Sequence, residues 1–304
     1  MAVNPKRAAT VILLREIKTG GFEVFLLKRH EKNSFMGGIF VYPGGRVDRD
    51  DGTLEVCARC KGLSFEQAHR ILGESIPPDE SFAHWIAGIR ELFEEAGVLL
   101  AYDQMGNPFQ LKNRREEERF LSYRESLQKG KLNICQVAQE ERLLFALDQL
   151  HYYAHWITPE ARPERFDARF FLSRHPLGQE AKHDRKEATV GLWLTPGEAI
   201  EGHLKGDIPL SPPTLKTLED LSRFGNIEEV FNSLKKREIQ PVLPFLTKIS
   251  DVPLILFPWD PDYEAFRNGE IPNTIDHGRP SGPGDNTTRL ILREGRWFPC
   301  CRTL

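Results

Sequence analysis

Hydrophobic and polar positions follow two different periods in the N-terminal part of the chain. Residues 8–14 and 22–27 are short, mostly apolar runs, and Thr19-Gly20-Gly21 lies between them. Two such runs around a glycine-containing connection predict a β-hairpin. From residue 81 to residue 96, by contrast, apolar residues recur every three or four positions, which predicts an amphipathic helix.

Strand and helix patterns continue to alternate along the rest of the chain, which is typical of the α/β class. We expect strands at 39–42, 151–158, 167–173 and 188–194, and helices at 64–72, 113–130, 139–149, 196–204, 212–224 and 227–236. The tail from residue 240 is rich in Pro and Gly. Two apolar runs within it, 253–257 and 288–293, predict further strands.

The helix predicted at 81–96 has one apolar and one acidic face. At about 100° per residue, its apolar positions are Trp85, Ile86, Ile89, Leu92, Phe93 and Ala96. Glu91, Glu94 and Glu95 fall within roughly a 100° arc on the opposite face. These carboxylates repel one another at the negative end of the helix dipole, and no lysine between 81 and 98 offsets them. A solvated acidic face is one explanation; we favour a bound cation, Mg²⁺ or Mn²⁺, which oxygen ligands suit.

Composition narrows the functional classes. With 304 residues, the chain can form one large or two ordinary domains. The net charge of −3 provides no basic surface, so we expect no nucleic-acid partner. No apolar run is long enough to span a membrane, and residues 1–7 lack the apolar core of a secretory signal. Five cysteines give no even disulfide framework, so we expect a reducing, cytoplasmic location.

The acidic helix ends in a recognisable string of residues. Residues 90–98 read R-E-L-F-E-E-A-G-V and match R-E-U-x-E-E-x-G-U (U aliphatic), the second half of the Nudix box, at every fixed position. The chain therefore resembles the MutT-like Nudix hydrolases, in which this box carries Mg²⁺ and which cleave diphosphates linked to another moiety. The resemblance implies an α/β fold: a Nudix-type α/β/α sandwich with a mixed sheet. We place the Nudix domain at 1–225, with insertions at about 49–80 and 104–150, and a C-terminal extension packed on it at 226–304.

An insertion divides the box. The usual spacing, G-x5-E-x7-R-E, puts the arginine 14 positions after the first glycine. Gly45 and Arg90 are 45 positions apart, so roughly 31 residues are inserted. Phe82 stands eight positions before Arg90, where the first-half glutamate belongs, and either Glu80 or Asp48 is a candidate to replace it. An insertion at this place resembles the peroxisomal-type coenzyme A diphosphatase branch and its bacterial relatives.

Other segments resemble the same branch. They are 25–29, 40–45, 87–100, 156–160, 165–167 and the W-L-T-P-x-E-A element at 193–199. Coenzyme A-specific Nudix enzymes often carry a motif before the box. This sequence matches the motif at 38–45 and departs from it at Ser34, where the motif has an arginine. We therefore expect a diphosphatase of coenzyme A or acyl-coenzyme A, releasing 3′,5′-ADP and (acyl-)phosphopantetheine. A nucleotide-sugar, dinucleotide or NADH diphosphatase is the alternative enzyme, and a non-catalytic Nudix-like binding or regulatory module is the third possibility.

The resemblance also implies roles for the acidic residues. Glu91 and Glu95 are expected as inner-sphere metal ligands, with Glu94 close behind, and all three as catalytic residues. Arg90 either braces a carboxylate or the glycine pair, or forms an ordinary i,i+4 pair with Glu94. Glu187 is a candidate general base, because it precedes a predicted strand in a polar loop; a merely solvated loop is the alternative.

Four further residues are candidates for contact with a small-molecule diphosphate substrate. Lys28 and Arg29 follow the second strand and can meet phosphates, although a solvated strand end explains them equally simply. Gly44 and Gly45 permit a tight turn that approaches a ligand closely. The pair Cys57-x-x-Cys60 lacks the four ligands of a structural zinc site, so reduced thiols are favoured. The state of assembly stays open, with a homodimer as one alternative.

Overall fold

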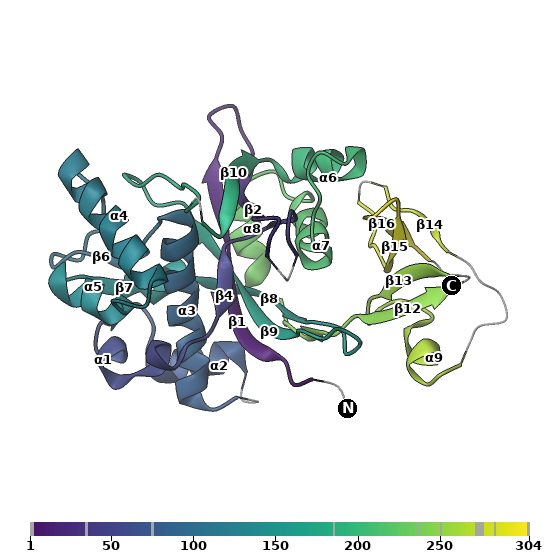
Figure 1. Cartoon of the computed structure of the whole chain (residues 1–304), viewed down its shortest axis with the longest axis horizontal. Coiled ribbons are helices and arrows are strands. Elements are labelled where there is room, and N and C mark those ends of the chain that lie inside the picture. Colours follow the sequence, from purple (N-terminus) through teal and green to yellow (C-terminus); the bar gives the residue numbers. More distant parts are fainter. Residues whose placement is uncertain are drawn as a thin grey trace.

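A computed structural model provides the structure of the chain. It describes residues 3–33, 36–73, 76–184, 186–235, 237–249, 251–270, 277–282 and 284–302. These residues form a large mixed sheet with helices on both faces, and a smaller sheet formed by the C-terminal residues lies to one side (Figure 1). Ser34, at the departure from the coenzyme A motif, lies outside the described residues.

The large sheet has the strand order β10-β2-β1-β9-β8-β11, with β3 beside β2 and β4 beside β1. Its strands are β1 (Lys6–Glu16), β2 (Phe22–Arg29), β3 (Phe40–Val41), β4 (Gly44–Arg46), β8 (His151–Ile157), β9 (Phe166–Arg174), β10 (Ala188–Leu194) and β11 (Pro241–Val242). The expected hairpin is formed by β1 and β2, with Leu14 opposite Val24. Because β1 also pairs in parallel with β9, the sheet is mixed, as predicted.

The acidic helix is α3 (Pro78–Ala96), which begins about one turn before the predicted start. Proline suits this first position, where its missing N–H would have no partner within the helix. The predicted apolar face is buried: Trp85, Ile89 and Leu92 are each at most 1% exposed. Trp85 packs on Phe171 of β9, with ring centroids 4.7 Å apart. Gly97 ends the helix in the left-handed conformation, at φ 72°.

Helices α6 (Pro196–Lys205), α7 (Pro212–Leu221) and α8 (Ile227–Leu234) cover the opposite face of the sheet (Figure 1). Strand β1 supplies both cores because its side chains alternate between the two faces. Val11 is buried on the face of the sheet that α3 covers, whereas Ile12 is buried on the face that α6–α8 cover. The predicted α/β/α sandwich is thereby confirmed.

The two expected insertions pack around α3. The first contains η1 (Arg49–Gly52), α1 (Leu54–Cys57), β5 (Cys60–Lys61) and α2 (Phe65–Leu72), and the second contains α4 (Arg114–Gln128), α5 (Ile134–Glu140), β7 (Leu144–Ala146) and η2 (Leu147–Gln149). β7 pairs with both β5 and β6 (Ala101–Tyr102), so a small sheet joins the insertions.

One predicted helix, 139–149, is wrong. α5 ends at Glu140, and the chain turns at Arg142, which has a φ of 54°. Beyond the turn, Phe145, Ala146 and Leu147 are all buried, and residues 144–146 form the short strand β7. A short continuous apolar run does not distinguish a strand from a helix by its period, which is why the sequence pattern predicted a helix.

The C-terminal residues form a five-stranded sheet in the order β12-β13-β15-β16-β14, with α9 (Tyr263–Arg267) beside it. Its strands are β12 (Phe245–Ile249), β13 (Val252–Leu256), β14 (Arg279–Pro280), β15 (Arg289–Arg293) and β16 (Arg296–Cys301). β13 and β15 confirm the two strands expected in the tail. Thr287 donates a hydrogen bond to Glu219 of α7 at 2.7 Å, which connects this sheet to the sandwich.

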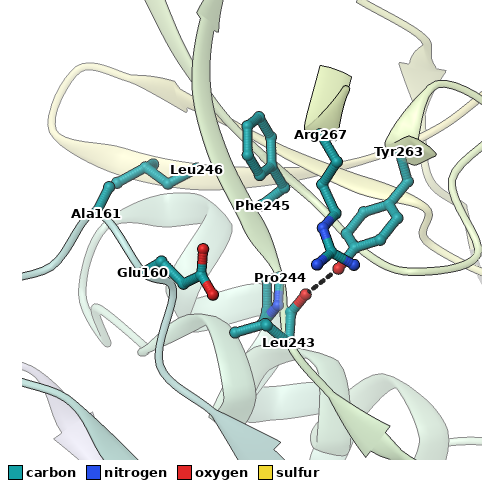
Figure 2. A pocket seen from close by; sticks show the side chains of 8 residues that line it. All are labelled: Glu160, Ala161, Leu243, Pro244, Phe245, Leu246, Tyr263 and Arg267. Atoms are coloured by element: carbon teal, nitrogen blue, oxygen red, sulfur yellow. Dashed lines mark hydrogen bonds between the residues drawn. The ribbon is translucent and has the colours of Figure 1, made fainter. Parts of the chain in front are cut away.

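A small hollow of about 30 Å³ lies between Glu160 in the β8–β9 connection and the segment 243–246 (Figure 2). Tyr263 closes one side and donates a hydrogen bond to the carbonyl of Leu243 at 2.6 Å. The volume suits one or two water molecules rather than a substrate. Among the residues that the structure describes, no helix combines the length and hydrophobicity needed to cross a bilayer.

Candidate active site

Gly44 and Gly45 lie in strand β4 beside β1, not in the expected tight turn. Their lack of a side chain serves close packing instead. A Cβ atom on Gly45 would lie 2.4 Å from Oε1 of Glu91, and one on Gly44 would lie 2.6 Å from the carbonyl oxygen of Ala9. Glycine therefore lets the acidic face of α3 approach the backbone of β4. The predicted turn is wrong; the close approach seen here is to a protein carboxylate, and the approach to a ligand stays a prediction.

The three glutamates of α3 make different contacts beside β4. Glu95 is 6% exposed and accepts a hydrogen bond from the N–H of Gly44 at 2.9 Å. Glu91 and Glu94 both accept hydrogen bonds from Nη1 of Arg90, at 2.9 and 3.1 Å. Glu91 and Glu95 thus lie against the glycine strand, and Glu94 is linked to the strand through Arg90.

Arg90 links three segments of the site. Its Nε and Nη2 donate to the two carboxylate oxygens of Asp51, each at 2.9 Å. Nη2 also donates to the carbonyl of Arg46, in β4, at 2.7 Å. Both geometries considered for Arg90 are therefore present together: it braces the glycine strand and pairs with Glu94.

Asp51 is the site residue that sequence reasoning missed. It lies six positions after Gly45, which is the G-x5-E spacing of the box counted forward, with Asp in place of Glu. Counted this way, the acidic position precedes most of the inserted residues, because Asp51 lies in η1 at their start. Counting back from Arg90 led to Phe82, whose ring is buried in α3 and stacks on Phe65 at 5.4 Å. The forward count was a signal available in the sequence.

Neither replacement proposed for the first-half glutamate takes that place. Glu80 forms an ion pair with Arg7, in β1. Asp48 approaches Nη2 of Arg90 only at 3.6 Å, and its side chain is 64% exposed. Asp51, at 1% exposure, forms the direct two-pronged contact.

The site holds more negative than positive charge. Burial raises the pKa of Glu91 to about 7, although the neighbouring Arg90 favours the charged form. Burial, reinforced by repulsion from Glu91, also raises the pKa of Glu95. The pKa of Glu94 is raised as well, again chiefly by burial. The single positive charge of Arg90 therefore does not offset the cost of ionising these three buried carboxylates.

A donor set of carboxylate oxygens with excess negative charge suits Mg²⁺ or Mn²⁺. In the described part of the chain, no three His, Cys, Asp or Glu side chains converge as a ready metal site. The hydrogen bonds explain this, because Glu91 and Glu94 turn towards Arg90 while Glu95 turns towards Gly44. The residues fit a divalent cation in chemistry and charge, and rotation of the Glu91 and Glu94 side chains would free their oxygens for it.

A cleft of about 270 Å³ opens beside the acidic residues. One wall carries acidic side chains, among them Glu94, together with Arg90. The other wall is formed by residues of the second insertion. The lining residues are Asp48, Asp50, Asp51, Arg90, Glu94, Leu127, Gly130, Lys131, Leu132, Asn133, Ile134 and Gln136. The volume is sufficient for part of a diphosphate-containing metabolite.

The remaining candidates lie at the β2–β10 edge, outside the lining of this cleft. Arg29 pairs with Ala188 across these strands and is near enough to Glu95 to act on its pKa. Glu187 precedes β10, and its charge raises the pKa of both Glu94 and Glu95. Lys28 instead lies 3.9 Å from Glu31. Arg29 and Glu187 therefore act electrostatically on the acidic cluster, whereas Lys28 lies beside Glu31.

The arrangement of the chain is similar to that of a solved Nudix hydrolase from Alicyclobacillus acidocaldarius. The TM-score is 0.63 at 24% sequence identity, over 79% of this chain and 99% of that one. This similarity identifies the fold as that of the Nudix hydrolases.

A family model, the NUDT19 Nudix domain, matches residues 54–223. That match covers more than half of the chain, so the protein belongs to the NUDT19 Nudix domain family of Nudix hydrolases and is an enzyme. The chain is also similar to the acyl-coenzyme A diphosphatase NUDT19 of Xenopus laevis, with 27% identity over 91% of this chain and 82% of the relative. The human protein of the same name is 25% identical over 91% of this chain and 80% of its own length. The family inferred from residues 90–98 is confirmed.

Proposed function

We propose that the protein hydrolyses the diphosphate linkage of coenzyme A or acyl-coenzyme A with the help of Mg²⁺ or Mn²⁺. The observation that carries this proposal is the grouping of Glu91, Glu94 and Glu95 around Arg90 and the β4 glycines. The names of the relatives, acyl-coenzyme A diphosphatases, support the choice of substrate.

In the proposed reaction, water attacks one phosphorus of the diphosphate and the bridging P–O bond breaks. The products are 3′,5′-ADP and phosphopantetheine, which keeps the acyl group if one was present. Glu91, Glu94 and Glu95 would hold the divalent cation, which neutralises phosphoryl oxygens and acidifies the attacking water when bound. Arg90 orients two of these carboxylates, and Glu187 accepts the proton of the water. Arg29 and the β4 glycines lie beside the phosphates, and Lys28 contributes at most to the outer edge.

The proposed Nudix domain, residues 1–225, is completed by α8 and β11 of the extension 226–304, which cover one face of its sheet and add a strand at its edge. The second insertion supplies one wall of the cleft. Five free cysteines are consistent with a reducing, cytoplasmic setting, which we also propose.

A substrate panel in Mg²⁺ tests the proposal. Coenzyme A, a medium-chain acyl-coenzyme A, NADH, a diadenosine polyphosphate and a nucleotide sugar are incubated with the wild type and with a Glu94→Gln, Glu95→Gln double variant. We expect 3′,5′-ADP from the first two substrates and a loss of at least a hundredfold in the double variant. Preference for NADH, a dinucleotide or a nucleotide sugar would transfer the function to that substrate. Binding without turnover of any diphosphate would instead indicate a binding module.

A further inference from the structure

Helix α4, in the second insertion, does more than cover the surface. Phe120 packs edge-on against Phe93 of α3, with ring centroids 6.1 Å apart. Further along α4, Arg124 is 5% exposed. Its Nε donates to the carbonyl of Glu94 at 2.7 Å, and its Nη2 donates to the carbonyl of Glu95. The cation of Arg124 thus caps the C-terminal end of the acidic helix.

These acceptors are the backbone groups of two proposed metal-binding glutamates. The last carbonyls of a helix have no partner within the helix, and a cation is favoured at this end of the dipole. A Cβ atom on Gly97 would lie 3.2 Å from Nη1 of Arg124. The glycine of the box therefore serves twice: it adopts the left-handed conformation and admits the guanidinium.

The same helix also holds the loop that carries Glu187. Arg124 Nη2 donates to the carbonyl of Lys182 at 2.8 Å. Gln128, one turn later, donates from Nε2 to the carbonyl of Glu94 at 3.0 Å and to Oδ2 of Asp184 at 2.8 Å. One side-chain amide therefore bridges the acidic helix and the loop.

Asp184 in turn binds the backbone around Glu187. Its carboxylate accepts hydrogen bonds from the N–H groups of Lys186, Glu187 and Ala188, at 3.0, 3.1 and 2.9 Å. The Lys186 ammonium in turn donates to Oε1 of Gln128 at 3.0 Å. Gln128 thus uses both ends of its amide on this connection.

We propose that Arg124 and Gln128 are positioning residues that set where the Glu187 loop stands relative to the acids of α3. The proposal rests on the proposed hydrolase function and extends it to a helix outside the Nudix box. It assigns the second insertion a role in catalysis: α4 joins the metal-binding acids and the proposed base, which belong to segments far apart in the sequence. Neither residue touches the reacting atoms, and each acts through the backbone that it holds.

The test uses Gln128→Ala and Arg124→Lys in the full-length protein, with Glu118→Gln as the matched control on the exposed side of α4. Displacement of a proposed base by a fraction of an ångström lowers turnover much more than substrate affinity. We expect kcat to fall on the order of tenfold in Gln128→Ala with KM within about twofold, and no change in the control. Arg124→Lys keeps the charge but loses the fork that reaches several carbonyls, so we expect partial activity. Unchanged kcat in a folded Gln128→Ala protein would overturn the proposal.

Two further measurements separate positioning from mere stabilisation. In a double-mutant cycle, Gln128→Ala should add little to the loss already caused by Glu187→Gln, because both act through one group; losses that multiply would contradict the proposal. Amide hydrogen exchange at 182–184 and 186–188 should accelerate in Gln128→Ala while exchange in β1 stays constant. This readout does not depend on substrate. If the wild type hydrolysed no diphosphate, the proposed function would fail, whereas unchanged loop exchange would refute the contact between α4 and the loop.

Discussion

Arg90 and Asp51 form a buried, two-pronged ion pair although 39 positions separate them in the sequence. Both N–O distances are 2.9 Å, and Asp51 is 1% exposed. The pair joins the two halves of the interrupted Nudix box, because Asp51 ends the first half and Arg90 begins the second. The insertion can therefore be long without separating the acids of α3 from the glycine strand.

Asp51→Asn should destabilise the protein and reduce activity together. The substitution removes the negative partner of two charge-assisted hydrogen bonds of Arg90, whose charge still faces Glu91 and Glu94, at a cost of about 1.5–3 kcal/mol. The released guanidinium would also redistribute towards Glu91 and Glu94, which it already contacts. Urea unfolding and turnover measure the two effects. The neighbouring Asp50→Asn is the control for stability alone, since Asp50 is exposed but lines the cleft, and its free energy of unfolding should stay within about 0.5 kcal/mol of the wild type. Equal stability of the two variants would contradict the proposed importance of the pair.

Gly45→Ala should impair metal use more than stability. The added Cβ would lie 2.4–2.7 Å from the carboxylate of Glu91, which is the mobile end of a side chain and can move aside at low cost. The move would displace a proposed ligand, so we expect the Mg²⁺ concentration for half-maximal activity to rise about tenfold or more. Gly197→Ala is the matched control, because nothing lies within 4 Å of its Cβ position. A Gly45→Ala enzyme with normal Mg²⁺ dependence would show that Glu91 is not a ligand.

Local patterns revealed the parts of the site that lie within one element. The 3.6-residue period and the string at 90–98 identified α3, its buried face and the Nudix family. The sequence could not reveal contacts made by tertiary packing. Arg124 resembles any arginine on a charged helix, and only the packing of α4 places it against the end of α3. Gly44 and Gly45 likewise look like turn residues, and only the structure shows β1 packed beside Gly44 and the carboxylate of Glu91 beside Gly45.

Glu95→Gln should stabilise the metal-free protein while it weakens the response to Mg²⁺. Burial, with repulsion from Glu91, raises the pKa of Glu95, so the charged carboxylate is costly without a cation. Glutamine removes this charge and keeps an oxygen for the N–H of Gly44. We expect a higher Tm than the wild type in EDTA. Mg²⁺ at a hundred times its Kd should raise the free energy of unfolding of the wild type by about 2.7 kcal/mol. The same Mg²⁺ concentration should raise that of the variant only slightly. Equal Mg²⁺ stabilisation of both proteins would exclude Glu95 as a ligand.

His84 gives α3 a pH dependence that is separate from the acids. The ring is 1% exposed, and its Nδ1 contacts the carbonyl of Glu80 at 2.7 Å. A carbonyl only accepts, so Nδ1 carries the proton and Nε2 is the basic nitrogen. Nε2 is buried without a hydrogen-bond partner among the described residues. Burial therefore lowers the pKa of His84 to about 4.

This lowered pKa predicts acid sensitivity between pH 6.5 and 4. Above pH 6.5 the imidazole is neutral in the folded and in the unfolded protein, so this group stabilises the fold fully and its effect does not change with pH. As the pH falls towards 4, the unfolded chain binds a proton that the folded protein refuses, so the free energy of unfolding should decrease by up to about 3 kcal/mol. Below pH 4 both states bind the proton and this contribution no longer changes. His84→Phe removes the titrating group, so urea unfolding at pH 7, 6, 5 and 4 should give a flatter profile than the wild type. Parallel profiles for the two proteins would show that His84 titrates normally in the folded state.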